Sequence, residues 1–300
     1  MKIGRAKVCV ALAGVAALIA GSGAAFATEG GGSIYPHGVE TFLVGALPPP
    51  GTYFLNTTNY YQASRLNDGS GNKAVPHFRL DAVSDSLRFV HVTDLKLLGA
   101  DVGAQVIVPL VNLDVNINGA KQSKSGLGDI TITPLILGWH FDKMHYVTGL
   151  DFNVPTGKYR KNDLANLGRN YLEIEPLLAL TYLDPAGPEL SAKFMYDFNT
   201  ENHGTDYTSG QEFHVDYAAG WTIDTWTVGI SGYYDKQMTD DRQYGMKVGP
   251  DGNKGEAFAL GPAVKYASRG MQFWGSWQNE LVAHNRTQGD KFWLRFSLPL

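Results

Sequence analysis

The sequence predicts an all-β fold: a transmembrane antiparallel β-barrel of about 12 strands over residues 52–300, preceded by a short N-terminal plug or leader. Two observations lead to this prediction. After residue 50, short segments alternate apolar and polar residues with a period of two, as strands between lipid and a polar lumen do. The connections between these segments alternate between long and short, which is typical of outer-membrane barrels, because their periplasmic turns are tight and their opposite loops are long.

Six long and five short connections would join twelve strands and place both chain ends on the periplasmic side. The predicted long connections are Leu66–His77, Asn112–Gly128, Thr156–Asn170, Asn199–Gln211, Asp235–Gly255 and Ala283–Asp290. The predicted tight turns are Asp94–Lys96, Asp142–Lys143, Asp184–Gly187, Asp224–Thr225 and Ser268–Gly270.

Residues 1–27 are predicted to be a secretory signal peptide. Three basic residues precede the apolar run Val8–Ala20, and Ala25-Phe26-Ala27 has the pattern of a cleavage site, so the mature chain is expected to begin at Thr28. An uncleaved membrane anchor is the alternative, but the apolar run is short for a span of roughly 20 residues. The signal and the barrel pattern together predict the outer membrane of a Gram-negative bacterium as the location.

The composition of the mature chain excludes several classes of function. Its only cysteine, Cys9, lies inside the predicted signal, so the mature chain can form no disulfide or thiolate metal site. Without the basic residues of the signal, 22 basic and 29 acidic residues remain, a net charge of −7 with no basic patch for nucleic acid. No mature stretch holds about 18 consecutive apolar residues, which excludes a helical membrane protein.

Residues 28–51 precede the predicted barrel and are rich in glycine and proline, which argues against a strand. Within them Val39–Leu47 is an apolar patch too short to span a membrane. A short helix or plug inside the lumen is one interpretation, since barrels of this size often need filling. A disordered periplasmic leader is the other, and the sequence leaves both open.

Among the predicted strands, Leu98–Leu110 is the clearest. One set of its alternate positions is apolar and would face lipid, whereas Asp101 and Gln105 would face the lumen. In Phe78–Thr93 the alternation changes phase near Ser84–Leu87, which indicates either a β-bulge or a register that the sequence does not fix.

The remaining strands vary in clarity. Regular alternation continues in Glu189–Asn199, Glu212–Trp221 and Lys291–Leu298, and two strands of ambiguous facing are Asp129–Phe141 and Glu256–Tyr266. Aromatic residues recur where strands meet tight turns and predict an interfacial girdle: Trp139, Phe141, Tyr146, Tyr182, Trp221, Trp226, Tyr266 and Phe273. The chain ends in Leu298-Pro299-Leu300, not in the aromatic residue that the barrel-insertion machinery often reads.

The inward positions of these strands carry many polar residues. A hydrogen-bonded network that braces the barrel is one interpretation, and the lining of a permeation path is another, since about 12 strands leave a narrow lumen. The predicted lining residues are Asp101, Gln105, Asp151, Glu173, Glu175, Lys193, Asp197, His214, Asp216, Trp274, Gln278, Glu280, Trp293 and Arg295. For Trp274 and Trp293, packing against the N-terminal residues is the alternative to solute contact.

The sequence offers no recognisable catalytic, metal or cofactor site. His203 with Asp206 and His214 with Asp216 are close histidine–acid pairs, but their spacing is what chance composition gives. No nucleophile elbow, zinc-protease or phosphate-loop motif occurs. The Asp- and Gly-rich loop 67–72 lacks the twelve-residue calcium pattern. We therefore predict that the protein is not an enzyme and needs no cofactor.

Several stretches of the chain resemble an outer-membrane family named after a meta-pathway of phenol degradation, which includes SphA-like proteins. They are Pro48–Tyr53, Gly126–Asp129 before a strand that ends in Gly138–Phe141, and Asn153–Tyr159 followed by Asn166–Gly168. The similarity covers nearly the whole mature chain. It implies a barrel related to channels for hydrophobic compounds.

From the resemblance we expect a monomeric passive channel for small hydrophobic or aromatic compounds. Its expected partners are outer-membrane lipid, the solute and the barrel-insertion machinery, and no nucleic acid. A structural or adhesive barrel without transport is the first alternative, and an outer-membrane hydrolase is the second.

Overall fold

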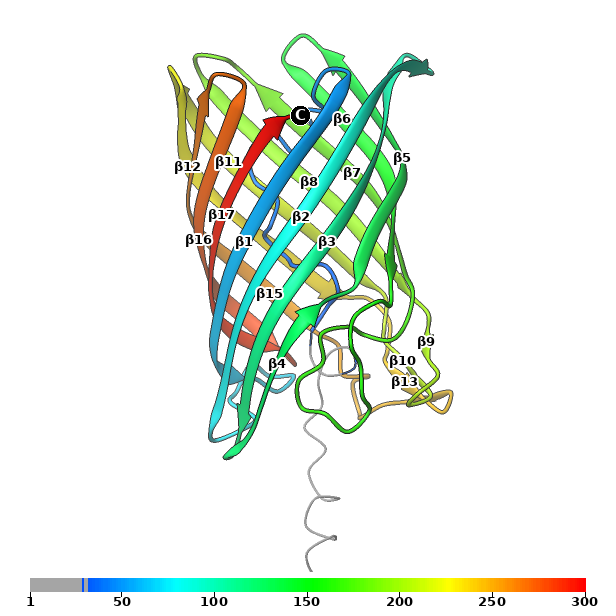
Figure 1. The fold of residues 1–300 in the computed structure, drawn as a ribbon. Coiled ribbons are helices and arrows are strands. Elements are labelled where there is room, and N and C mark those ends of the chain that lie inside the picture. The colour runs from blue at the N-terminus through cyan, green and yellow to red at the C-terminus, as the bar shows by residue number, and fades with distance from the viewer. Residues whose placement is uncertain (1–28, 30–31) are drawn as a thin grey trace, which may run out of the picture.

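The structure is a computed structural model that describes residue 29 and residues 32–300. It confirms the predicted all-β fold, a closed antiparallel barrel of twelve strands (Figure 1). The barrel strands are β1 (Gly51–Leu66), β2 (Phe78–Leu97), β3 (Ala100–Ile117), β5 (Ile130–Phe141), β6 (Met144–Val154), β7 (Glu173–Leu183), β8 (Pro188–Asn199), β11 (Glu212–Ile223), β12 (Trp226–Gln237), β15 (Glu256–Ser268), β16 (Met271–His284) and β17 (Thr287–Pro299). Each pairs with the next, and β17 closes the ring on β1. Among the described residues no helix is long and apolar enough to cross a membrane.

One predicted loop is a β-hairpin instead. The stretch Asn112–Gly128 was expected to be a long connection, but β3 continues to Ile117 and pairs with β4 (Ala120–Leu127). The reason is the Asn118-Gly119 turn, in which both residues have positive φ, the geometry that favours a two-residue hairpin. Other long loops contain two-residue strands: β9 (Glu201–Asn202), β10 (Tyr207–Thr208), β13 (Arg242–Gln243) and β14 (Met246–Lys247).

Two predicted connections are placed differently by the structure. The turn expected at Asp94–Lys96 lies at Leu98-Gly99, where both residues have positive φ, so Leu98 belongs to a turn and not to the outer face of β3. The connection Ala283–Asp290 is not long, because only Asn285 and Arg286 separate β16 from β17. Asn285 takes the left-handed conformation that such a tight turn needs.

The bulge expected near Ser84–Leu87 is also wrong. β2 pairs with β3 without interruption from Phe78 to Val92, and the register shifts only between Val92 and Lys96. The apparent change of phase reflects the lumen, since inward Leu80 packs on an apolar cluster, whereas inward Ser84, Ser86 and Arg88 in the middle of the strand are polar. A change in what the strand faces therefore looked like a change in its register.

The outer face of the barrel is apolar, with an aromatic belt at one end. Large exposed apolar side chains include Val83, Leu110, Leu178, Leu190, Val228, Ile230 and Leu294. At the end with the tight turns, which we call the turn end, the rings of Trp226, Tyr266, Phe273 and Phe296 follow one another with centroids 4.5–6.5 Å apart. This surface has the outward apolar band and interfacial aromatics of a barrel that spans a membrane.

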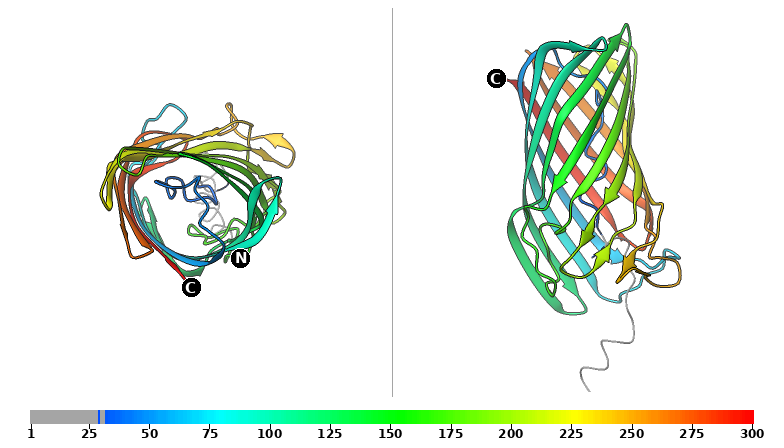
Figure 2. Two further views of the ribbon diagram at one scale, coloured as in Figure 1. Left: turned by 90° about the horizontal axis from the view of Figure 1, so that it is seen from above. Right: turned by 90° about the vertical axis from the view of Figure 1, so that its right-hand side faces the viewer.

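Residues 32–50, which we call the inner segment, run through the inside of the barrel (Figure 2). They leave β1 at the turn end, and Glu29 binds Tyr159, Asn202 and Ser209 in the loops at the opposite end, which we call the loop end. The C-terminus lies at the turn end (Figure 1). The prediction that both chain ends lie on one side is therefore wrong for the described N-terminal residues, whereas the predicted signal peptide lies outside the described residues.

Candidate functional site: a lumen divided by the inner segment

The inner segment is held mainly by one carboxylate on the barrel wall. Asp216 of β11 is buried and accepts three hydrogen bonds from the segment. The donors are the Tyr35 hydroxyl at 2.8 Å, the Gly38 amide at 2.7 Å and the Glu40 amide at 3.0 Å. Because a segment without regular structure must satisfy its amides with side chains, this carboxylate fixes its course through the lumen.

Further bonds continue along the same wall. The Leu43 amide donates to Ser191 Oγ on β8 at 3.1 Å, and the Gly45 amide donates to Thr181 Oγ1 on β7 at 2.9 Å. On β16, Gln278 Nε2 donates to the Gly38 carbonyl at 3.0 Å. The segment thus lies against one part of the wall and leaves free space beside the rest.

Replacing Asp216 with alanine is expected to free the inner segment. Three donors lose their acceptor, and each unsatisfied buried group costs about 1–3 kcal/mol. Hydrogen exchange measured by mass spectrometry should therefore be at least tenfold faster in residues 33–45. Asp290→Ala is the matched control, because Asp290 bonds Trp277 and Asn279 away from the segment. Unchanged exchange in Asp216→Ala would mean that other contacts fix the segment.

Apolar contacts support the same course nearer the turn end. Phe42 is buried with Ala218 and Ala263, and Trp274 packs against this cluster. Gly220 allows the approach, since a Cβ there would lie 2.8 Å from the Phe42 ring. Trp274 thus packs against the inner segment through Phe42 and also borders the cavity beside it.

Three cavities follow the free side of the lumen. The outer cavity at the loop end, of about 520 Å³, lies between Tyr61, Tyr159 and Trp293. The middle cavity, of about 250 Å³, shares Tyr35 with the outer one, and the inner cavity at the turn end is about 170 Å³. Because adjacent cavities have lining residues in common, they form a series along the barrel axis.

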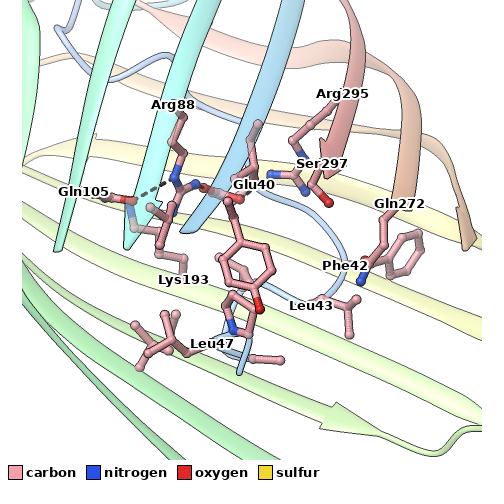
Figure 3. A pocket seen from close by; sticks show the side chains of 18 of the residues that line it. Glu40, Phe42, Leu43, Leu47, Arg88, Gln105, Lys193, Gln272, Arg295 and Ser297 are labelled. Atoms are coloured by element: carbon pink, nitrogen blue, oxygen red, sulfur yellow. Dashed lines mark hydrogen bonds and ion pairs between the residues drawn. The ribbon is translucent and has the colours of Figure 1, made fainter. Parts of the chain in front are cut away.

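A charged constriction lies between the middle cavity and the inner one, and Figure 3 shows its side chains in the lining of the inner cavity. Glu40 of the inner segment accepts from Arg88 Nη1 of β2 at 2.7 Å and from Arg295 Nη1 of β17 at 2.6 Å. Arg88 also donates to Gln105 at 2.7 Å, and Lys193 borders both cavities. These side chains line both cavities, so paired charges lie across the free side of the lumen where the two cavities meet.

The inner cavity beyond the constriction is mostly apolar. Trp274, Phe42 and Ile136 line it together with other aliphatic and aromatic side chains. Arg295 stacks on the Trp274 ring, with its guanidinium carbon 4.3 Å from the ring centroid. Apolar walls with a few placed polar groups are typical of sites for small organic molecules.

In the loops, one ion pair lies at the edge of the outer cavity. Lys124 Nζ lies 2.6 Å from Asp163 Oδ2, which borders this cavity. The hydrogen bond from Lys124 lowers the pKa of Asp163 below its ordinary value. The loop that carries Asp163 is thereby tied to β4.

The predicted lining residues are all buried or half-buried, and the structure divides them into two groups. Eight border the three cavities: Gln105, Asp151, Glu175, Lys193, Trp274, Glu280, Trp293 and Arg295. Six do not border them: Asp101, Glu173, Asp197, His214, Asp216 and Gln278. Asp216 and Gln278 bind the inner segment, and Asp101 pairs with Lys96 near the turn end.

Three residues of the site were missed by sequence reasoning. Glu40 is a lone acid inside the apolar patch Val39–Leu47, and a charge in such a patch signals a buried partner. Arg88 lies in the strand whose facing was misjudged. Arg286, which pairs with Glu212 and Asp235, falls in a stretch that was expected to be an outer loop.

Comparisons with known proteins agree with this architecture. Residues 63–296 match the family described as "Putative MetA-pathway of phenol degradation". None of the curated proteins compared with the chain matches it significantly. The crystal structure of the COG4313 outer membrane channel from Pseudomonas putida F1 is similar, with a TM-score of 0.76, 16% identity, and coverage of 85% of this chain and 97% of that one.

Two autotransporter barrels are more distant. The β domain of Bordetella BrkA has a TM-score of 0.49 and 12% identity, with 84% of this chain and 100% of that one covered. The transport unit of AIDA-I from Escherichia coli has a TM-score of 0.49 and 8% identity, with 85% and 91% covered.

Proposed function

Since the chain belongs to the family described as "Putative MetA-pathway of phenol degradation", we propose that it is a passive outer-membrane channel for small hydrophobic or aromatic compounds. The observation that carries the proposal is the series of three cavities beside the inner segment, with the charged Glu40 group between the middle cavity and the inner one. The proposal includes a cleaved signal peptide, insertion by the barrel machinery, and an inner segment that acts as a plug.

The lining of the route suits an aromatic solute. Trp293 and Tyr61 border the outer cavity, and Trp274 borders the inner one. Aromatic side chains offer a large contact area with little loss of rotamer freedom, and their rings stack with other rings. A solute would contact these rings in turn along the free side of the lumen. The turn end of the barrel would face the periplasm.

Solute uptake by vesicles tests the proposal. Vesicles that carry the protein are expected to take up phenol and larger aromatic solutes faster than empty vesicles. Trp274→Ala should alter the uptake of aromatic solutes, because this side chain borders the inner cavity. Trp277→Ala is the matched control on the same strand, since Trp277 is 42% exposed on the outer face.

Two outcomes would contradict the channel. Uptake equal to that of empty vesicles would leave the structural or adhesive barrel as the better explanation. Hydrolysis of lipid or ester substrates by the purified protein in detergent would favour the outer-membrane hydrolase instead. In both experiments, heat-modifiable mobility on a detergent gel shows that the protein used is a folded barrel.

A further inference from the structure

Three neighbouring strands bring Glu175, Asp197 and His214 together on the inner wall. β8 pairs with both β7 and β11, so that these residues meet across two strand pairs. His214 Nε2 lies 3.0 Å from Asp197 Oδ1 and 3.9 Å from Glu175 Oε2. All three side chains are fully buried, and one donor atom of each lies within 4.8 Å of the others.

Several polar atoms of this group have no hydrogen-bond partner within the described part of the chain. They are Glu175 Oε2, Asp197 Oδ2 and His214 Nδ1. Glu175 Oε2 faces His214 Nε2, but 3.9 Å is too long for a hydrogen bond. A buried carboxylate oxygen without a partner is costly, so this position calls for a ligand.

The charges around the group favour a cation as that ligand. Asp151, Glu173, Glu175 and Asp197 are all buried, and the one lysine or arginine that forms an ion pair with any of them in the described chain is Lys193. Its Nζ lies 3.4 Å from Glu175 Oε1, so the other oxygen of Glu175 is left for a second positive charge. Buried charges in proteins are paired or coordinate metals.

A second group of the same kind is already neutralised. His37, Glu212 and Asp235 also lie close together, but Arg286 Nη1 contacts both carboxylates. A metal there would have to displace a buried guanidinium. No arginine or lysine bridges Glu175 and Asp197 in the described residues, which distinguishes the first group.

We propose that Glu175, Asp197 and His214 bind one divalent transition-metal ion, of the kind that takes carboxylate oxygen and imidazole nitrogen. Zinc fits this donor set with distances of about 2.0–2.2 Å, which puts ligand atoms roughly 3.3 Å apart in a tetrahedron. The separations of 3.0 Å and 3.9 Å from His214 Nε2 to the two carboxylate oxygens lie on either side of that value. Imidazole favours zinc and similar ions over magnesium and calcium, which prefer oxygen ligands alone.

The cavities give an ion access to the three side chains, and the inner segment covers them. Glu175 lines the middle cavity, which connects to the loop end through the outer one. Tyr35 and His37 of the inner segment lie over His214, with ring centroids 4.8 Å and 4.6 Å from its ring. A bound ion would therefore link β7, β8 and β11 beneath the inner segment.

Zinc binding by the full mature protein in detergent, without a histidine tag, tests the site. His140 and His145 lie at the turn end with their Nδ1 atoms 2.8 Å apart; His140 is exposed and His145 half-buried, so they could bind zinc themselves. All samples therefore carry His140→Gln and His145→Gln. After treatment with EDTA, dialysis against zinc and gel filtration, we expect one zinc per chain by elemental analysis.

Adding Asp197→Asn or His214→Gln should abolish stoichiometric zinc, whereas His37→Gln should retain it. Cobalt in place of zinc should give ligand-field absorption bands that disappear in the His214→Gln protein. Heat-modifiable mobility shows that each variant is folded. The proposal would be overturned if the protein bound no stoichiometric zinc. It would also be overturned if His37→Gln lost the zinc and Asp197→Asn retained it. Neither result would contradict the proposed channel function.

Discussion

Replacing Glu40 with glutamine is expected to raise single-channel conductance several-fold and to shift ion selectivity toward anions. Glu40 is the one carboxylate that Arg88 and Arg295 pair with in the described chain, and it joins them across the free side of the lumen. Without its charge, two guanidiniums face the path unpaired and repel each other. At about 4 Å and an effective dielectric constant near 20, each lost ion pair is worth roughly 4 kcal/mol, enough to open the constriction.

Glu201→Gln is the matched control for this substitution. Glu201 is exposed in an outer loop, and its ion-pair partner among the described residues is His203, so the same change of charge leaves the constriction intact. Planar bilayer recordings in potassium chloride measure both conductance and reversal potential. Identical currents in Glu40→Gln and the unaltered protein would show that the constriction does not limit the path.

Deleting residues 30–47 tests the inner segment as a whole. The deletion removes Glu40 together with the residues that bind Asp216 and Gln278, so it should raise flux beyond the level of the point substitution. Uptake of aromatic solutes by vesicles gives a second measurement of the same effect. A deletion that lowers both would indicate that the segment organises the path instead of obstructing it.

Ile230→Arg is expected to prevent most of the protein from assembling. Ile230 lies on β12 with 46% of its surface exposed on the outer face, four residues beyond Trp226 of the aromatic belt. An arginine on the lipid face near the bilayer centre costs roughly 2–4 kcal/mol. The measurement is the fraction of heat-modifiable barrel recovered from outer membranes.

Met238→Arg, just beyond the end of the same strand, provides the control. Met238 follows β12 directly and is 49% exposed, but it lies at the loop end beyond the expected hydrocarbon. The same substitution should therefore be tolerated. Equal recovery of the two variants would contradict the orientation of β12 relative to lipid.

Several features of the fold follow from the local pattern of the sequence. Alternation placed Asp101 and Gln105 inside and their neighbours outside, because the side-chain period of a strand is two wherever the strand runs. Tight turns such as Asp142–Lys143 and Asp224–Thr225 were located correctly, since turn residues mark them locally. The Asn118-Gly119 hairpin had an equally local signal that was overlooked.

Predictions were wrong where the alternation of apolar and polar residues depends both on the register of the strand and on the polarity of its surroundings. The change of phase at Ser84–Leu87 was read as a bulge, although β2 keeps its register and only the polarity of the lumen changes. Periodicity measures which side of a strand meets apolar surroundings, and it cannot separate a shift of the strand from a shift of the surroundings.

The sequence by itself determined the barrel, the approximate positions of most strands and the facing of the regularly alternating ones, because these depend on a period of two and on turn chemistry. Only the tertiary structure decided what the inward residues do. Glu40 and Arg295 are 255 positions apart. Glu175, Asp197 and His214 come from three strands. No spacing along the chain therefore indicates either group. The constriction, the cavities and the candidate metal site exist because the closed ring of strands and the inner segment bring these distant side chains within bonding distance.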